Sequence, residues 1–468
     1  MSFIRHKLIK KTKYAYEITA YWDKELKKFR QKSKYLGKVD EKGNISNKKA
    51  NKQEKLQLDF GNGYLLQQFI SNLETSKVFS GSLKFIANDL IPLISYCLCN
   101  KSAMYNANTW FEGNILSLLF KNANLSSQNI SRIFKKLGNE KLQRDFFWEY
   151  LGTVHNIENG IIIDATSLPS QCNTDFNAWG RNDGSIDKQM RMLCVVDQVS
   201  KIPLYYRYLP GNILDVSTLE HTIKELTLFG VKNKFVLIDA GYFSEANILD
   251  LYEKQIDFLT RLPAGRLIYK DIISNHINDI ENIQYATRCN EMAVFVKEVA
   301  VDLFGKQGFA YVVLDPTRKA KELQQKMLDY VNGDSLSEEV NIATCGIMIL
   351  ISSISMNPKS VINDYYLRQS VEQVFGFYKD DLGLLPLRKH SDETISGYLL
   401  LQFIALVVFI QFRNKIKEKY TVEQALNITR NLKCKIFEDG EILVAEPTKK
   451  QKEIFELFNY TVPKICGI

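Results

Sequence analysis

The chain has 468 residues, of which 45% are hydrophobic and 24% charged, as is typical of a soluble globular protein with two to four domains. Because its N-terminus is charged from the start, we expect no signal peptide. Its longest apolar stretch, residues 398–412, contains two glutamines and is shorter than the roughly 20 residues of a membrane span, so we expect a buried core helix there. The eight cysteines are scattered, which favours free thiols in a reducing cytoplasm.

The net charge of +8 hides a strongly basic N-terminal arm. Residues 1–55 carry 17 Lys and Arg against six Asp and Glu, whereas the rest of the chain carries 44 against 47. This asymmetry indicates a polyanion partner, although a solvated lysine-rich arm is the alternative. Residues 14–22 alternate like a strand, and a lysine-rich turn leads to residues 32–40. We therefore expect a basic β-hairpin followed by a polar linker over residues 40–55.

Helical periodicity follows up to residue 150. Within it, residues 124–138 resemble the second half of a helix-turn-helix, with Ser126 placed to cap a helix and Gly138 placed to end it. Apolar residues at helical spacing form an inner face. The outward positions hold residue types suited to base edges and phosphates: Gln128, Asn129, Arg132, Lys135 and Lys136. The sequence supports a DNA-reading helix and an ordinary amphipathic helix equally.

From residue 155 the pattern changes to strands. Five apolar runs predict strands over residues 160–166, 191–198, 202–211, 234–242 and 256–262. Helices are predicted over 217–230 and 245–254, a strand-rich insertion over 265–345, and a further strand over 346–355. The order β-β-β-α-β-α-β is that of an RNase H-like sheet, in which a right-handed crossover places the fourth strand beside the first.

Two aspartates end the strands that this topology makes neighbours. Asp164 and Asp239 are expected at the C-terminal ends of the first and fourth strands. The carboxyl ends of such strands meet at one edge of the sheet, where open α/β sheets place their ligands. Two close carboxylates repel each other, and a divalent cation resolves that conflict. Oxygen-only ligands indicate Mg²⁺ or Mn²⁺.

Residues 365–379 predict a helix with an unusual polar stripe. At about 100° per residue, Tyr365, Arg368, Glu372 and Lys379 fall within about 60° of each other, next to an apolar sector. Taken alone, the stripe is explained by an i,i+4 ion pair between Arg368 and Glu372 on an amphipathic helix.

The predicted sheet edge gives this stripe a second explanation. If the helix crosses that edge, Glu372 adds a third carboxylate to the two aspartates, and the three could hold two metal ions roughly 3.5–4 Å apart for phosphoryl transfer. Arg368 as a fork and Lys379 as a point charge would then hold the scissile phosphate. Tyr365 could donate to a phosphate oxygen.

These motifs, in this order, resemble those of the DDE insertion-sequence transposases of the YREK group, which is marked by Y-x2-R-x3-E-x6-K. The four stripe residues satisfy that spacing without gaps. "IIIDATS" around Asp164 resembles the first-Asp motif, and "LIDAGYFS" around Asp239 resembles the D-x-G-Y second-Asp motif. "LPGNILD" at 209–215 resembles the stretch between them. The resemblance covers residues 155–412, and the N-terminal arm is similar to one subgroup.

The resemblance implies a transposase that cleaves transposon ends and transfers strands with Asp164, Asp239 and Glu372 as catalytic residues and ligands of two Mg²⁺ or Mn²⁺ ions. Its expected partners are double-stranded DNA, as terminal inverted repeats and target, and a second copy of the chain on paired ends. The chain lacks a G-x-x-x-x-G-K-[ST] loop, so no nucleotide is expected. No membrane partner is expected either, and a cytoplasmic location is expected.

The expected fold is α/β: an RNase H-like mixed sheet flanked by helices, interrupted by a β-rich insertion and preceded by the arm and a helical DNA-binding region. We expect the β arm and linker at residues 1–55 and the helical region at 56–150. The catalytic core is expected in two parts, at 151–264 and 346–415, on either side of the insertion at 265–345. A C-terminal region is expected at 416–468.

Two other functions stay open on the sequence. One is a structure-specific nuclease on the same fold, such as a junction resolvase, which cuts branched DNA and never joins ends. The other is a domesticated, non-catalytic DNA-binding protein. A glycosidase with paired carboxylates fits neither the basic arm nor the Arg/Lys stripe.

The sequence also departs from relatives that excise through a DNA hairpin, which trap a flipped base on a tryptophan of the insertion. None of the four tryptophans falls within residues 265–345. Phe295 or Tyr311 could substitute by stacking, or the hairpin step works differently.

Overall fold

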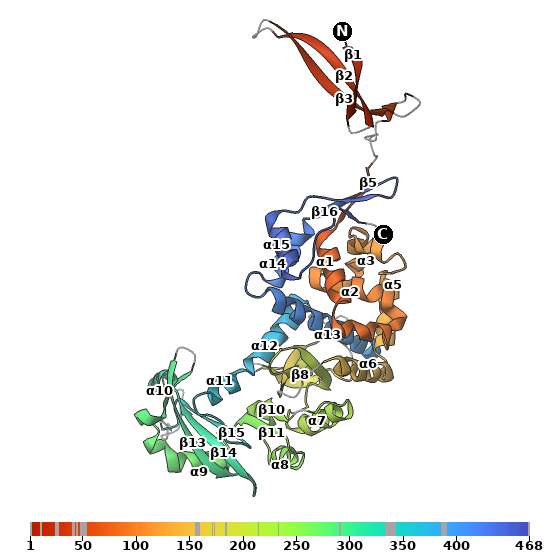
Figure 1. Cartoon of the computed structure of the whole chain (residues 1–468). Coiled ribbons are helices and arrows are strands. Elements are labelled where there is room, and N and C mark those ends of the chain that lie inside the picture. The colour runs from red at the N-terminus through yellow and green to blue at the C-terminus, as the bar shows by residue number, and fades with distance from the viewer. Residues whose placement is uncertain are drawn as a thin grey trace.

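A large mixed β-sheet flanked by helices forms the body of the chain, and a small separate sheet lies at its N-terminal end (Figure 1). The computed structural model describes residues 2–466 except 10–11, 24–27, 40–42, 44, 47–53, 155–159, 171, 173, 183–184, 214, 233, 290–291, 333–342 and 385–390.

The N-terminal sheet has four antiparallel strands in chain order: β1 (Ser2–Ile9), β2 (Thr12–Asp23), β3 (Lys28–Val39) and β4 (Ile45–Ser46). The predicted hairpin corresponds to β2 and β3, but the sequence prediction missed β1. Its alternation is hidden because Arg5 and Lys7 interrupt the apolar residues, and every residue of β1 is exposed. Most of the predicted linker over 40–55 lies outside the described residues. Its last two residues instead begin β5 (Glu54–Asp59), which pairs with a C-terminal strand.

The helical region follows β5. Its α-helices are α1 (Gly61–Ser71), α2 (Ala87–Cys99), α3 (Ala107–Glu112), α4 (Leu116–Leu119), α5 (Ser127–Leu137) and α6 (Glu140–Thr153). Helix α5 begins as predicted, since the Ser126 side chain accepts a hydrogen bond from the Asn129 backbone N–H. Its apolar face is buried and packs on α13 (Asp392–Ile416), where the rings of Phe134 and Tyr398 lie 5.5 Å apart.

Helix α13 runs through the core, and at 25 residues it extends beyond the apolar stretch that predicted it. By length and composition it is the one single helix among the described residues that could cross a membrane, and a bent pair over residues 74–80 and 84–99 passes the same test only when taken together. However, 89% of the most apolar window of α13 is buried inside the protein. The C-terminal region adds α14 (Val422–Arg430), β16 (Lys433–Phe437), β17 (Ile442–Val444), α15 (Lys449–Leu457) and β18 (Ile465–Cys466).

The contact between α5 and α13 is close enough to require glycine. A Cβ added to Gly397 would lie 1.8 Å from the Phe134 carbonyl oxygen. We expect Gly397→Ala to lower the free energy of unfolding by about 1–3 kcal/mol, because a backbone atom cannot move aside. Gly152, near the end of α6, has open space around its Cβ position, so Gly152→Ala should be neutral or slightly stabilising. Chemical denaturation of the two variants checks this, and equal effects would contradict it.

The central strands are β6 (Ile161–Pro169), β7 (Ala178–Asn182), β8 (Ser185–Asp197), β9 (Pro203–Pro210), β10 (Phe235–Ile238) and β11 (Asp257–Arg261). Helices α7 (Leu219–Leu228) and α8 (Glu245–Glu253) connect the last three. Strand β10 pairs with β6 in parallel, so the predicted adjacency of the first and fourth strands is observed. Strands β8 and β11 pair with the outer sides of β6 and β10, and β9 pairs with β8.

The insertion differs from the predicted β-rich unit in two ways. It contains two helices, α9 (Leu267–His276) and α10 (Pro316–Val331), beside strands β12 (Ala286–Cys289), β13 (Met292–Asp302) and β14 (Gln307–Leu314). Its strands also continue the central sheet, because β15 (Ile347–Ser352) pairs with β14 on one side and β11 on the other. Helix α10 carried a readable start signal, since Asp315 caps it and Pro316 occupies its first turn.

The helix predicted over 365–379 is broken into three pieces: α11 (Val361–Tyr366), α12 (Gln369–Gly376) and a π-helical turn, η9 (Phe377–Asp381). At the first break the backbone bonds tighten to i→i+3 spacing, and the Ser370 hydroxyl donates to the Leu367 carbonyl at 2.6 Å. Such side-chain bonds compete with regular helix geometry.

Candidate active site

Asp164 is almost fully buried and lies within β6, not at its end as predicted, because the strand continues in pairing with β8 as far as Pro169. Its Oδ1 accepts a hydrogen bond from the Ala165 backbone N–H at 2.8 Å, and its Oδ2 accepts one from Arg368 Nη1 at 2.6 Å. Burial raises the pKa of Asp164 to about 6, against the lowering effect of the Arg368 guanidinium. The carboxyl is therefore poised to lose its charge in mildly acid solution.

Asp239 follows β10 directly, and its side chain is 39% exposed. The Tyr365 hydroxyl donates to its Oδ1 at 3.2 Å. Burial, and then the charge of Asp239, raise the pKa of Tyr365, so this hydroxyl remains a donor. The Asp239 backbone carbonyl accepts bonds from the Tyr242 N–H and the Thr260 hydroxyl, which fix the turn after the strand.

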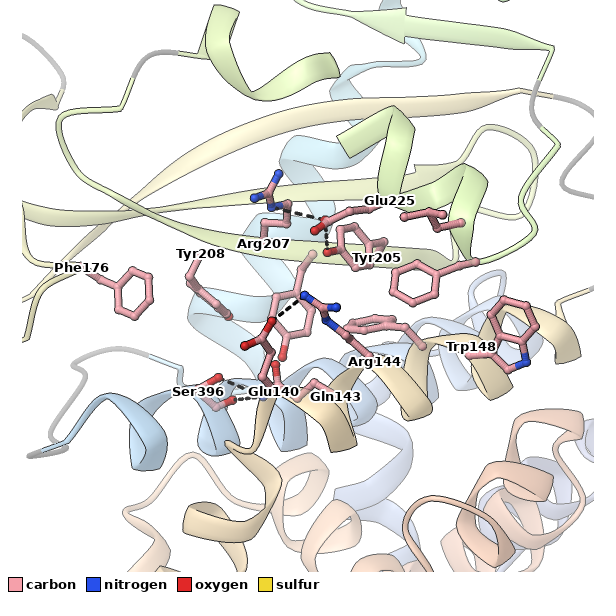
Figure 2. A pocket seen from close by; sticks show the side chains of 14 residues that line it. Glu140, Gln143, Arg144, Trp148, Phe176, Tyr205, Arg207, Tyr208, Glu225 and Ser396 are labelled. Atoms are coloured by element: carbon pink, nitrogen blue, oxygen red, sulfur yellow. Dashed lines mark hydrogen bonds and ion pairs between the residues drawn. The ribbon is translucent and has the colours of Figure 1, made fainter. Parts of the chain in front are cut away.

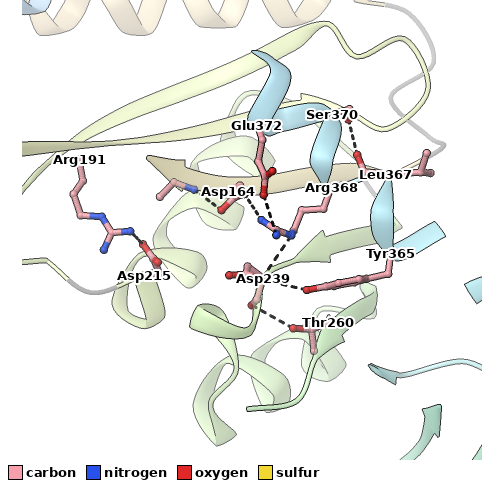
Figure 3. Close-up of polar contacts among 11 residues, drawn as sticks. Asp164, Arg191, Asp215, Asp239, Thr260, Tyr365, Leu367, Arg368, Ser370 and Glu372 are labelled. Atoms are coloured by element: carbon pink, nitrogen blue, oxygen red, sulfur yellow. Dashed lines mark hydrogen bonds and ion pairs between the residues drawn. The ribbon is translucent and has the colours of Figure 1, made fainter. Parts of the chain in front are cut away.

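Arg368 joins these aspartates to Glu372 (Figure 3). Its Nη1 lies 2.6 Å from Asp164 Oδ2, its Nε 3.6 Å from Asp239 Oδ1 and its Nη2 3.1 Å from Glu372 Oε1. The predicted i,i+4 ion pair thus exists, but the same guanidinium also contacts both aspartates. We call Asp164, Asp239 and Glu372 the carboxylate cluster.

The charge of this arginine is secured by its neighbours. Burial works to lower the pKa of Arg368, but Asp164 and Asp239, with smaller contributions from Tyr365 and Glu372, raise it overall. The carboxylate cluster therefore surrounds a permanent positive charge. Glu372 is the most open of its members, with a side chain 55% exposed.

The carboxylate cluster fits a divalent cation in the kind of ligand it offers. All its donors are carboxylate oxygens, which suit Mg²⁺ or Mn²⁺. Across the described ranges, however, no three His, Cys, Asp or Glu side chains are arranged to hold one metal ion together. The Arg368 guanidinium is the cation among these carboxylates in the structure.

Lys379 lies on the η9 turn, and its Nζ donates to the Thr166 hydroxyl at 2.7 Å. Thr166 is two residues beyond Asp164 on β6, so its side chain shares a face of the sheet with that aspartate. All four stripe residues therefore reach the region around Asp164 and Asp239, although three of them come from different helical pieces and Arg368 comes from the break between α11 and α12.

An Arg191–Asp215 ion pair beside the carboxylate cluster was not predicted (Figure 3). Arg191 Nη2 lies 2.7 Å from Asp215 Oδ1. Burial raises the pKa of Asp215, and Arg191 opposes this. A Cβ added to Gly241 would lie 3.2 Å from Asp215 Oδ2, so the pair abuts the turn that carries Asp239. The signal was present, because Asp215 closes the "LPGNILD" stretch.

The predicted DNA-reading residues of α5 have separate surroundings. Gln128 and Arg132 are exposed, Lys135 lies 3.9 Å from Glu393, and the Lys136 ammonium lies 5.4 Å from the centre of the Phe85 ring. Asn129, also predicted to face outward, is partly exposed. Its side-chain amide donates to the Asn124 carbonyl at 2.7 Å, because the loop before the helix folds back over its first turn.

Of the two residues considered for base stacking in the insertion, the structure excludes one. Tyr311 is fully buried, and its hydroxyl contacts Glu298 and the Met356 backbone. Its ring is therefore closed to a base. Phe295 on β13 is partly buried.

A separate hollow of about 440 Å³ lies along β9, between α6 and α7 (Figure 2). Its charged residues are internally satisfied: Arg144 pairs with Glu140 at 2.6 Å, and Glu225 accepts a bond from Tyr205 at 2.5 Å. No residue of the carboxylate cluster lines it.

Residues 155–408, more than half of the chain, match the family model "Transposase DDE domain". No curated protein matches. Among solved structures, the cryo-EM structure of the piggyBac transposase synaptic complex with hairpin DNA is similar at a TM-score of 0.40 and 12% identity, over 85% of this chain and 69% of that chain.

Proposed function

Because the chain belongs to the family of transposases with a DDE domain, we propose that it binds the ends of an insertion sequence and cleaves and joins DNA there with Asp164, Asp239 and Glu372. A transposase of this family is a DNA-cleaving and strand-transfer enzyme, and the finer assignment to the YREK group is part of the proposal.

One observation carries the assignment of the site. Three carboxylates from three distant parts of the chain meet around a single guanidinium. An ordinary i,i+4 pair between Arg368 and Glu372 would not place two further carboxylates, from two other parts of the chain, against the same guanidinium. The strand order β9-β8-β6-β10-β11 supports an RNase H-like core that brings the two aspartates together.

Transposases of the DDE family generally use divalent metals. When bound, two Mg²⁺ or Mn²⁺ ions held by the carboxylate cluster would supply activation of the attacking oxygen and stabilisation of the leaving oxygen. Within the protein, Arg368 holds the three carboxylates close together. The Tyr365 hydroxyl orients Asp239 through the bond to its Oδ1.

Arg368 and Lys379 are the proposed contacts to the scissile phosphate. The guanidinium offers a planar fork that matches two phosphate oxygens, whereas the Lys379 ammonium acts as a point charge. Both lie beside Asp164, one on its Oδ2 and the other on Thr166. A DNA phosphate bound here would compete with the carboxylates for Arg368. DNA binding would therefore release the carboxylate cluster from its contacts with Arg368.

End recognition is assigned to the basic arm and to α5, with two copies of the chain acting on paired ends of double-stranded DNA in the cytoplasm. The body beyond residue 55 is close to neutral, so the arm supplies most of the long-range attraction to DNA.

The test is cleavage and joining of a labelled transposon end, taken from DNA that flanks the coding region and carries matching inverted repeats. A transposase should yield joined products in Mg²⁺. A structure-specific nuclease should cut branched DNA without joining, and a domesticated DNA-binding protein should bind the end and leave it intact.

Arg132 gives a sharper test of end recognition. Arg132→Ala should cost about 1–3 kcal/mol of binding and relax the base preference at one position, if the exposed side chain contacts a base edge. Asn129→Ala is the matched control on the same helix, since the Asn129 side chain bonds Asn124. Binding to a panel of mutated ends measures this. Uniform weakening would mean a phosphate contact, and unchanged binding would remove α5 from the interface.

A further inference from the structure

The N-terminal sheet exposes large aromatic side chains although it lies apart from the body (Figure 1). Phe3, Trp22, Phe29 and Tyr35 are all roughly half exposed or more. A soluble protein rarely leaves such side chains on an open sheet unless a partner covers them. The strand register shows which of them share a face and which charges accompany them.

Two neighbouring cross-strand rows bring tyrosines and cations together. Directly paired residues lie on the same face of a sheet, as do residues two apart on one strand. Tyr16 on β2 is opposite Arg5 on β1 and Tyr35 on β3. Tyr14 is opposite Lys7 and Lys38. The six form one patch, which we call the cation–tyrosine cluster: Arg5, Lys7, Tyr14, Tyr16, Tyr35 and Lys38.

The members of the cation–tyrosine cluster touch one another. The Tyr35 ring centre lies 6.1 Å from that of Tyr14 and 5.5 Å from that of Tyr16, and the Lys7 ammonium lies 5.6 Å from the centre of the Tyr16 ring. These two rows contain three cations and no carboxylate. The surface thus combines concentrated positive charge with a continuous set of rings.

The opposite face of the same sheet has a different character. There Glu17 is paired across the strands with Lys34, so part of the positive charge is offset by a carboxylate. Tyr21 is opposite Arg30, with no second tyrosine in that row. The two faces therefore differ in their chemistry while sharing one backbone, which makes each a control for the other.

We propose that the cation–tyrosine cluster binds single-stranded DNA. Proteins that hold unpaired strands combine a positive surface for the phosphates with aromatic rings on which the bases stack. In a duplex the base faces are covered by their neighbours and cannot reach such rings. The proposal rests on the function proposed above only in taking DNA as the polyanion, because a transposase works at cut ends where strands become unpaired.

The test measures binding of the full chain by the fluorescence anisotropy of a labelled oligothymidylate. The same labelled strand is measured alone and as a duplex with oligodeoxyadenylate. Tyr35→Ala should weaken binding of the single strand by roughly 5- to 150-fold, the range for loss of one base–aromatic stack. Tyr21→Ala is the matched control, because both side chains are 45% exposed but lie on opposite faces. It should change binding by less than about twofold.

A second pair of variants guards against misfolding. Replacing both Arg5 and Lys7 with Glu should make single-strand binding less dependent on salt. The slope of the logarithm of the binding constant against the logarithm of the salt concentration should become shallower by about 0.7 for each phosphate that the protein no longer neutralises. Replacing Lys32 and Lys34 with Glu makes the same change in charge on the other face and should affect binding less. Equal losses from the two faces, or a greater effect of Tyr35→Ala on the duplex, would overturn the proposal. Cleavage of a transposon end by the carboxylate cluster is read separately, so failure of one assignment leaves the other standing.

Discussion

Asp239→Asn is expected to abolish cleavage and joining of a transposon end while leaving binding of that end intact. Asparagine keeps the size of the side chain and an acceptor for the Tyr365 hydroxyl, but it removes one of the negative charges that face Arg368 and that would hold divalent cations. We expect a loss of about 10³-fold or more, since residues that act as one catalytic unit fail together. For the same reason, adding Asp164→Asn or Glu372→Gln should cost little more.

The measurement is cleavage of a labelled end in Mg²⁺, with a binding assay on the same DNA. Asp197→Asn is a suitable control, because Asp197 is another buried aspartate whose Oδ1 accepts bonds from the Ser200 backbone N–H and hydroxyl in a turn. That variant should lose stability and keep its cleavage rate per folded molecule. Cutting by Asp239→Asn at near the parent rate would show that Asp239 is not part of the catalytic centre.

Arg368→Lys is expected to lower the rate of strand transfer by about 10- to 100-fold while changing the affinity for DNA by less than about threefold. The charge is retained, but an ammonium cannot present two parallel N–H groups to a phosphate or reach three carboxylates at once. The loss should therefore fall on the transition state, in which the phosphate is held most tightly.

A second arginine separates this role from that of an ordinary ion pair. Arg318 and Glu322 on α10 form an ion pair at 2.6 Å. They are four residues apart in sequence, as are Arg368 and Glu372. Arg318→Lys should leave binding and strand transfer unchanged. If both variants behave alike in single-turnover strand transfer and in binding, Arg368 is only a helix-stabilising partner of Glu372.

Local signals were sufficient for much of the chain. The apolar runs before Asp164 and Asp239 are buried strands, because short, continuous apolar runs that contain β-branched residues and are bounded by turns suit a sheet covered on both faces. Ser126 caps the start of α5, because a side-chain acceptor at that position takes the hydrogen bond of a backbone N–H that has no partner within the helix. The pairing of β6 with β10 also followed from the sequence, since the handedness of a crossover limits where the fourth strand can lie.

Features that depend on distant parts of the chain were missed. The insertion strands looked like an independent unit, but β15 joins them to β11, and such pairing leaves no local trace in either strand. Asn129 is of a residue type that can read base edges, yet its side chain donates a hydrogen bond to the backbone of the preceding loop. The sequence allowed Tyr311 to stack on a base, but in the folded chain its side chain is fully buried.

The amino-acid sequence was sufficient to identify the catalytic candidates and their order, because residue identity and spacing carry the chemistry of carboxylates, guanidinium and ammonium groups. How Arg368 is used became visible only in the folded chain. Its i,i+4 partner Glu372 could be read from helix periodicity, whereas its contacts with Asp164 and Asp239 cross more than 100 residues of chain. Those contacts exist because α12 packs against β6, where pairing with β10 places Asp164 beside Asp239, and because the buried Asp164 carboxylate needs a cationic partner.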